Sequence, residues 1–410
     1  MNTYFERYAY RITLFTDKPD ASLKLAVVIP CFNEPDIIST LNSLNSCQKV
    51  EATEVIIIIN ESEAEQVEIT EANRKTIEEI EEWKEKKNPW FKLLSYNLKI
   101  PNKDAGVGFA RKAGMDEASR RFEQVGNVKG VICCFDADST CSANYLSSVY
   151  HHYYQTELPP IGSSIYYEHL FPSEPILRSG IIQYELHLRY YANALQFIGY
   201  PYAHQTVGSS MVVRSDMYQK IGGMNKRKAG EDFYFLHRLM PAGYYTDITD
   251  TCIYPSPRIS DRVPFGTGKA MEKWKMTDQE DYMSYNLSSF KNLKILFKSL
   301  EAIYRHGNIS MIPIEDNVDQ FLKKENFDKV LERILGQSKS LQQFKKQFYA
   351  YFDGFKVLKY IHFSRDHYYH NTPVLEAARA LCQVKWHESK DHLSPEELLT
   401  YYRGKDRGLT

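Results

Sequence analysis

VKGVICCFDADST, residues 128–140, combines a short apolar run with two aspartates that lie two positions apart. The continuous apolar residues VICCF, 131–135, are typical of a strand that is covered on both faces of a sheet. Continued alternation along such a strand would direct Asp136 and Asp138 to the same side. Two neighbouring carboxylates repel each other unless a cation lies between them. The stretch therefore predicts a buried strand with a cation bound at its end.

Apolar runs upstream of this strand alternate with segments of helical periodicity. The runs are LAVVIP at 25–30, VIIIIN at 55–60 and FKLLSYNL at 91–98. We expect Pro30 to end the first run, because proline has no backbone N–H to donate. Strands that alternate with helices predict an α/β fold with a mostly parallel sheet and right-handed crossovers.

Ligands of parallel sheets bind beyond the carboxyl ends of the strands. Residues 30–34, 60–62, 102–108 and 136–138 follow the four predicted strands, so we expect them to face one crevice. From about residue 276, helix-length segments dominate the sequence. We therefore predict a lead-in at 1–24, a catalytic domain at 25–275 and a helical C-terminal subdomain at 276–410.

Composition excludes several classes of protein. The formal net charge of −1 over 410 residues argues against a protein that coats nucleic acid. Residues 1–20 lack the apolar core of a secretion signal. No window approaches the ~18 apolar residues that a membrane-spanning helix needs. The seven cysteines include no CxxC pair, which favours reduced thiols in a cytoplasmic protein. No feature predicts an oligomeric state.

Two acidic pairs are the candidate reactive groups. Asp136 and Asp138 suit Mg²⁺ or Mn²⁺, which bind through one or two carboxylates plus substrate phosphates. The simpler alternative is a solvated strand end. Glu231 and Asp232 begin a predicted helix, where the helix dipole alone could favour both acids. Their functional interpretation is a general base that takes the proton from an attacking hydroxyl.

Arginines in two Gly-containing segments could contact phosphates. Arg111 lies in GVGFARKAG, where it occupies the third glycine position of a dinucleotide-binding fingerprint, so a Rossmann dehydrogenase is disfavoured. Arg258 and Arg262 lie in PSPRISDRVPFGTGK, and guanidinium groups bind phosphates in a bidentate manner. A solvated surface arginine is the simpler interpretation of each. The chain has no P-loop and no GxSxG elbow.

Six motifs, taken in order, resemble the family 2 glycosyltransferases, which use nucleotide sugars and have the GT-A fold. Within residues 25–250 they are VVIPCFNEP, IIIINESE, GVGFARKAGMDEA, CCFDADST, GSSMVVRSDMYQKIGGM and AGEDFYFLHRL. The QxxRW signature of the processive polysaccharide synthases does not occur. The resemblance therefore implies an enzyme that transfers a single sugar, with inversion at the anomeric carbon.

The resemblance also implies roles for individual residues. Asp232 would be the catalytic base with Glu231 beside it, and Asp138 with Asp136 would bind Mg²⁺ or Mn²⁺ together with the donor diphosphate. Asn60 stands where an aspartate is usual, which leaves the base of the nucleotide open. We expect Arg258 or Arg262 to assist the departing diphosphate. The residues implied to contact the nucleotide sugar are Pro30, Asn33, Glu34, Asn60, Glu61, Arg111 and Asp136.

The implied substrates are a nucleotide-diphosphate sugar and a saccharide acceptor. A lipid-linked saccharide acceptor would place the protein at the inner face of the membrane. Two alternatives remain open. A nucleotidyltransferase also uses metal-bound carboxylates at strand ends but releases inorganic diphosphate. A nucleotide- or carbohydrate-binding protein would bind ligand without turnover.

Overall fold

The computed structural model describes residues 3–260, 266–277 and 281–409. These residues divide into two compact units. The first falls within Met1–Pro172, Thr206–Glu272 and Asp406–Leu409, and the second within Ser173–Gln205 and Lys273–Lys405.

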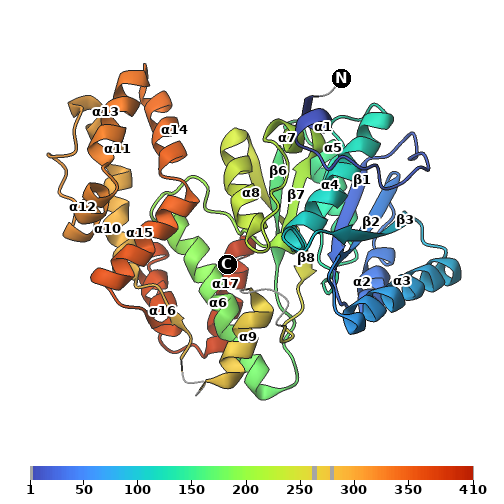
Figure 1. Ribbon diagram of the computed structural model, residues 1–410. Helices are drawn as coiled ribbons and strands as arrows, with labels where there is room; N and C mark the ends of the chain where they lie inside the picture. Colours follow the sequence, from blue (N-terminus) through green and yellow to red (C-terminus); the bar gives the residue numbers. More distant parts are fainter. Residues whose placement is uncertain (1–2, 261–265, 278–280, 410) are drawn as a thin grey trace. The chain divides into compact units, whose positions relative to one another are not determined.

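The first unit is built on a sheet of eight strands in the order β3-β2-β1-β4-β7-β6-β8-β5 (Figure 1). Four neighbouring pairs are parallel (β1 with β2 and with β4, β2 with β3, β6 with β8), and three are antiparallel. The predicted α/β fold with a mostly parallel sheet is confirmed. The strands are β1 (Leu25–Cys31), β2 (Thr53–Ser62), β3 (Lys92–Ile100), β4 (Val131–Cys134), β5 (Thr140–Cys141), β6 (Gly162–Tyr167), β7 (Met211–Arg214) and β8 (Tyr245–Tyr254).

Pro30 lies inside β1 and does not end it, so the predicted boundary was wrong. The amide of Phe135 donates to the carbonyl of Val28, which identifies the side of β1 that faces β4. The nitrogen of Pro30, two residues further on, points to the same side. β4 pairs with β1 only as far as Val28. The missing N–H of Pro30 therefore removes no hydrogen bond from the sheet.

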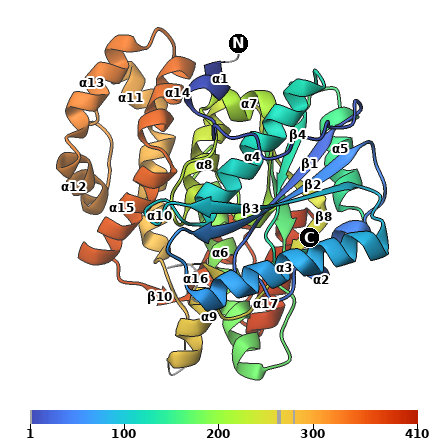
Figure 2. The ribbon, with the colours of Figure 1, turned by 45° about the vertical axis from the view of Figure 1, so that its right-hand side comes forward.

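Helices cover both faces of this sheet (Figure 2). The connections that contain α2 (Ile37–Asn45) and α3 (Val67–Lys87) advance across the sheet in one direction, whereas the connection that contains α4 (Val107–Gln124) returns. Right-handed crossovers then place α4 on the face opposite α2 and α3. The remaining helices of the unit are α1 (Thr3–Arg7), α5 (Tyr145–Tyr154), α7 (Ser215–Lys220) and α8 (Glu231–Leu239), with the 3-10 turns η1 (Gly208–Ser210) and η2 (Met240–Ala242).

α4 approaches the sheet closely because Gly114 faces it. A Cβ atom at this position would lie 2.5 Å from Cγ1 of Val28 and 3.1 Å from Cγ1 of Ile58. Any larger residue would push the helix away from β1 and β2. The position of α4 relative to the strand ends is therefore tightly defined.

The N-terminal segment packs against the outer side of α4. Asp116 of α4 is buried and accepts hydrogen bonds from the hydroxyl of Tyr4 at 2.5 Å, the amide of Tyr10 at 2.6 Å and the hydroxyl of Tyr218 at 2.7 Å. Lys112, one turn earlier, forms an ion pair with the same carboxylate at 3.0 Å. Residues before the first strand thus help to hold α4 in place.

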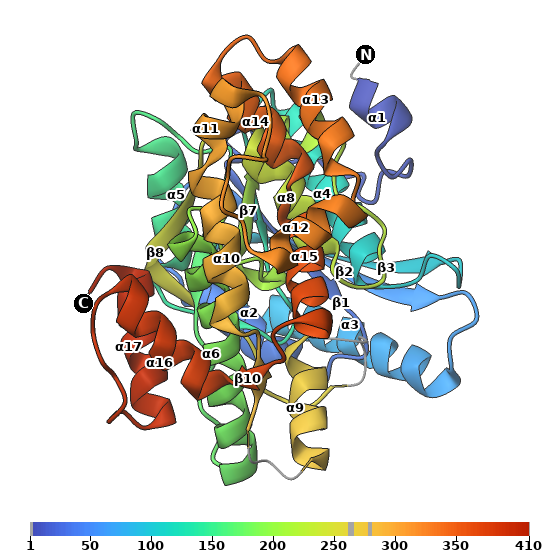
Figure 3. The ribbon, with the colours of Figure 1, turned by 90° about the vertical axis from the view of Figure 1, so that its left-hand side faces the viewer.

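The second unit is helical, as predicted for the C-terminal part of the chain. It also contains α6 (Pro175–Phe197), which comes from the middle of the sequence and packs against α16 (Figure 3). The boundary predicted at residue 275 stays a prediction. α9 (Thr267–Met276) leads into the unit, β9 (Met283–Ser284) and β10 (Thr372–Pro373) form a small antiparallel pair, and the further helices are α10 (Leu287–Lys298), α11 (Leu300–His306), α12 (Asp316–Lys324), α13 (Phe327–Gln337), α14 (Leu341–Tyr351), α15 (Gly354–His367), α16 (Val374–Lys385) and α17 (Pro395–Arg407).

Candidate active site

Asp136 and Asp138 lie in the loop between β4 and β5, and not within a strand. β4 ends two residues before Asp136, so strand alternation does not orient these side chains, and that expectation was wrong. The loop is held by α2 instead. Oγ1 of Thr40 lies 2.8 Å from the carbonyl oxygens of both Ala137 and Ser139.

Arg111, in the second turn of α4, joins three other segments of the unit. Its Nη2 donates to Oδ1 of Asp136 at 2.9 Å, its Nε to Oε1 of Glu231 at 3.1 Å, and its Nη1 to the carbonyl of Gly208 at 3.2 Å. The side chain is only 2% exposed. Burial opposes the charged form, but the two carboxylates outweigh it and raise the pKa of Arg111. The guanidinium therefore stays charged and fixes Asp136 and Glu231 relative to each other.

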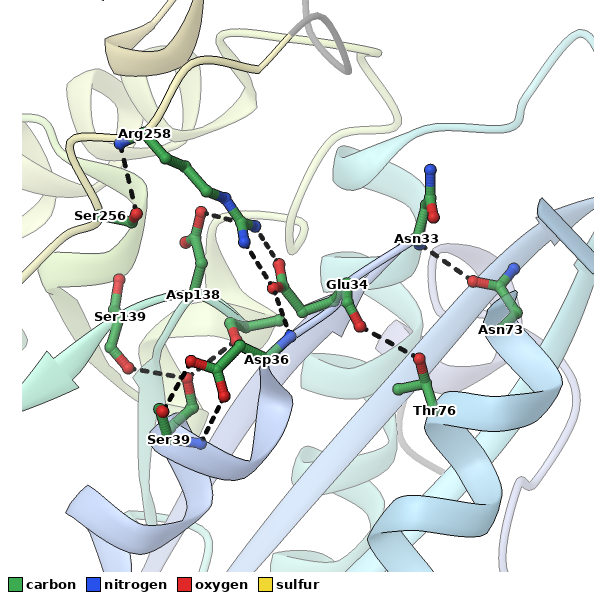
Figure 4. Close-up of polar contacts among 12 residues, drawn as sticks. Asn33, Glu34, Asp36, Ser39, Asn73, Thr76, Asp138, Ser139, Ser256 and Arg258 are labelled. Atoms are coloured by element: carbon green, nitrogen blue, oxygen red, sulfur yellow. Dashed lines mark hydrogen bonds and ion pairs between the residues drawn. The ribbon is translucent and has the colours of Figure 1, made fainter. Parts of the chain in front are cut away.

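Arg258, in the segment after β8, lies between the carboxylates of Glu34 and Asp138 (Figure 4). Its Nη1 donates to Oε1 of Glu34 at 2.7 Å, and its Nη2 pairs with Oε2 of Glu34 and lies 3.2 Å from Oδ2 of Asp138. Burial works against the cation, but Glu34 and Asp138 raise the pKa of Arg258 overall.

Each aspartate of the loop thus has its own arginine partner. Arg111 pairs with Asp136, and Arg258 pairs with Asp138. The sequence predicted a cation between the two carboxylates. In the structure, two guanidinium groups from distant parts of the chain supply the compensating charge.

α3 fixes the turn that carries Asn33 and Glu34 after β1. Asn33 adopts the left-handed region at φ 45°, which asparagine tolerates better than most residues. Its amide donates to Oδ1 of Asn73 at 3.0 Å, and Oγ1 of Thr76 donates to the carbonyl of Glu34 at 3.2 Å (Figure 4). These contacts present the Glu34 carboxylate to Arg258.

Asn60 and Glu61 lie within β2, which runs two residues past its predicted end. Both side chains are buried. Burial opposes ionisation of Glu61, but an ion pair with Lys99 of β3 lowers its pKa overall.

Glu231 and Asp232 begin α8, as the sequence predicts. Gly230 precedes them at φ 69°, a left-handed conformation that favours glycine. The carboxylate of Glu231 turns toward Arg111, whereas Oδ1 of Asp232 accepts the amide of Phe233 at 2.7 Å. Burial and the neighbouring charge of Glu231 raise the pKa of Asp232 to about 7.

Gly208 of η1 lies between Asp232 and the Arg111–Asp136 pair. Its part in the site was not predicted. A Cβ atom at this position would lie 3.0 Å from Oδ2 of Asp232 and 3.1 Å from Nη2 of Arg111. The only signal in the sequence was the GSS triplet before β7, which carries no charge. Asp136, Glu231 and Asp232 therefore gather around Arg111 and Gly208, and Glu34 and Asp138 gather around Arg258. Arg262 lies outside the described residues.

The segment from β1 to the end of α7 matches a known family. The sequence model of glycosyl transferase family 2 aligns with residues 26–222. Residues 26–222 form a glycosyl transferase family 2 domain. These residues include Glu34, Arg111 and both loop aspartates. Asp232 and Arg258 follow it in the sequence.

No curated protein matches the chain. Among solved structures, S. aureus TarS in complex with UDP-GlcNAc is similar over 94% of this chain and 92% of its own, with 13% identity and a TM-score of 0.38. S. aureus TarS 1-349 without a named ligand has 13% identity and a TM-score of 0.39 over 78% and 93% of the two chains. The mannosyltransferase PcManGT from Pyrobaculum calidifontis, in complex with GDP-Man and Mn²⁺, has 10% identity and a TM-score of 0.36 over 96% and 89%. The family assignment rests on the sequence match and not on these likenesses.

In the described parts of the chain, no helix is both long and apolar enough to cross a membrane.

Proposed function

We propose that the protein transfers a single sugar from a nucleotide-diphosphate sugar to a hydroxyl of a saccharide acceptor, with inversion. The observation that carries the proposal is the position of Asp232, whose pKa is raised to about 7, beside the Arg111–Asp136 pair of a family 2 domain. A general base works best when its pKa lies near the working pH. Asp232 meets this requirement, whereas Glu231 is engaged by Arg111.

The proposed step moves one proton and exchanges one bond. Asp232 accepts the proton of the acceptor hydroxyl while the hydroxyl oxygen attacks the anomeric carbon of the donor. The bond from that carbon to the diphosphate oxygen breaks, and the nucleoside diphosphate leaves from the opposite side. Attack and departure on opposite faces invert the configuration.

The loop aspartates are the proposed donor-side groups. Asp138 and Asp136 offer oxygen ligands of the kind Mg²⁺ and Mn²⁺ prefer, and such ions often bind through one or two carboxylates plus substrate phosphates. Among the residues that the structure describes, no group of three or more His, Cys, Asp or Glu side chains could hold a metal ion. When bound, the ion would supply positive charge to the departing diphosphate.

Arg258 is the second proposed partner of the donor diphosphate, in addition to the ion held by the loop aspartates. It already lies against Asp138, so a small movement of its guanidinium would bring it to phosphates bound near that carboxylate. Arginine suits this role because its planar group binds phosphate oxygens in pairs. Glu34, which is buried, would hold the arginine ready.

Product release tests the proposal directly. The full-length protein is incubated with UDP-GlcNAc or GDP-Man, each with and without Mn²⁺, and the released nucleotide is identified. Release of a nucleoside diphosphate that depends on active protein supports glycosyl transfer. In a parallel incubation with a nucleoside triphosphate, release of inorganic diphosphate would instead indicate a nucleotidyltransferase. Ligand binding that is indifferent to Mn²⁺, without any product, would indicate a binding protein.

A further inference from the structure

Two thiols lie next to each other where α2 meets β5. Sγ of Cys47, just beyond the end of α2, is 3.7 Å from Sγ of Cys141 in β5. Oγ of Ser43, one turn earlier on α2, is 3.8 Å from the same Cys141 sulfur. The amide of Gln48 also donates to the carbonyl of Ala143 at 2.7 Å, so the two backbones run close together at this point.

We propose that Cys47 and Cys141 form a reversible disulfide that fastens the end of α2 to the strand after the Asp136–Asp138 loop. The sulfurs need to approach by less than 2 Å to reach the bonding distance of about 2.05 Å. The backbone hydrogen bond beside them indicates that this approach needs little movement of either segment. No other element separates the two side chains.

The two sulfurs differ in a way that suits stepwise oxidation. Cys141 is partly exposed, whereas Cys47 is buried. A hydrogen bond between the two thiols lowers the pKa of Cys47 against the effect of burial, and the same contact together with burial raises the pKa of Cys141. The thiolate is the form that attacks a disulfide.

The oxidant is a small-molecule disulfide of the glutathione type. Cys141 exchanges with it to give a mixed disulfide and one free thiol. Cys47 then attacks the Cys141 sulfur and releases the second thiol. In total, the protein loses two protons and two electrons, and the small disulfide is reduced to two thiols.

The bond would tighten the loop that carries the aspartates. Thr40, on the same helix, already contacts the loop through Ala137 and Ser139. β5 is two residues long and pairs with β8, so a covalent bond from Cys141 to the end of α2 would add an anchor at the far end of the loop. An effect on sugar transfer rests on the proposed function, but the formation of the bond does not.

Peptide mapping and intact mass test the proposal on the full-length protein. After treatment with oxidised glutathione, we expect a mass loss of about 2 Da and a proteolytic fragment that joins the Cys47 and Cys141 peptides. Dithiothreitol should reverse both changes. Hydrogen exchange at residues 139–142 should slow by about tenfold in the oxidised protein, because the bond suppresses local opening.

Matched variants identify the sulfurs involved. Cys47→Ser and Cys141→Ser should each abolish the joined fragment, whereas Cys382→Ser, a buried thiol of the second unit, should leave it unchanged. The proposal would be overturned if the protein without substitutions kept a glutathione adduct and gave no joined fragment. A bond that dithiothreitol does not reduce would overturn it as well. Neither result depends on any measurement of sugar transfer.

Discussion

Arg258 and Glu34 form an ion pair across 224 positions of sequence, and the same guanidinium reaches Asp138 at 3.2 Å. The Glu34 side chain is 1% exposed, so Arg258 compensates a carboxylate that has almost no access to water. One side chain therefore serves both the stability of the first unit and the acidic loop.

Arg258→Gln should lower the free energy of unfolding by about 1–3 kcal/mol, because it leaves a buried carboxylate without its charged partner. Urea denaturation measures the change. Glu34→Gln, made alone and together with Arg258→Gln, provides the control, since the double variant removes both charges. We expect the double variant to recover part of the loss. Simple addition of the two single effects would show that the pair contributes nothing.

Arg111 should be the less replaceable arginine. Arg111→Met removes the cation that Asp136 and the buried Glu231 share, and removing one partner of a buried ion pair typically costs about 3–5 kcal/mol. Arg74→Met provides the control, because Arg74 is 67% exposed on α3 and should change stability by about 0.5 kcal/mol or less. Equal effects of the two substitutions in urea denaturation would contradict the role assigned to Arg111.

Asp232 should set the pH dependence of turnover. Its pKa is raised from 3.8 to about 7, so the protonated form dominates below pH 7 and cannot accept a proton. We expect kcat to rise with pH through a midpoint near 7. Asp232→Asn should lower kcat by about 10²–10⁴-fold and leave donor affinity largely intact. An unchanged kcat, or an unchanged pH profile in the residual activity, would remove Asp232 from the role of base.

The same raised pKa of Asp232 should make the protein less stable as the pH rises from 4 to 7. The folded state holds the Asp232 proton up to about pH 7, whereas the unfolded chain loses it near its ordinary value of 3.8. The contribution of this group is therefore fully present below pH 3.8 and is lost as the pH rises through 7. Asp232→Asn should flatten this part of the stability profile. Thermal unfolding measured from pH 4 to pH 8 tests it.

Gly208→Ala should impair turnover more than stability. The added Cβ would lie 3.0 Å from Oδ2 of Asp232, so the carboxylate must shift. We expect kcat to fall by about tenfold or more, because small misplacements of a catalytic group have large effects on rate. Gly336→Ala in α13 provides the control, since an added Cβ there meets nothing within 4 Å. A normal kcat in Gly208→Ala would show that the space at Gly208 does not matter for the position of Asp232.

The sequence predicted the sheet well because its strands are continuous apolar runs, and burial on both faces explains such runs directly. It predicted that Glu34, Asp136 and Asp138 gather near the strand ends, but it misplaced the end of the first strand at Pro30, placed Glu61 beyond the second strand and assigned Asp136 to a strand. These errors concern how far neighbouring strands pair with each other, which no local pattern reports. The partners of the acids were not predictable either. Arg258 meets Glu34 only through the packing of distant segments, and Gly208 matters through the space that it leaves.

The three hydrogen bonds that Asp116 accepts have a practical consequence for anyone who alters the start of the chain. Two of the donors belong to Tyr4 and Tyr10, and Asp116 lies five positions beyond Arg111 on the same helix. Trimming the first ten residues would strip those donors from a buried carboxylate. Such a truncation would therefore loosen the helix that carries Arg111, beside the proposed site of the sugar donor.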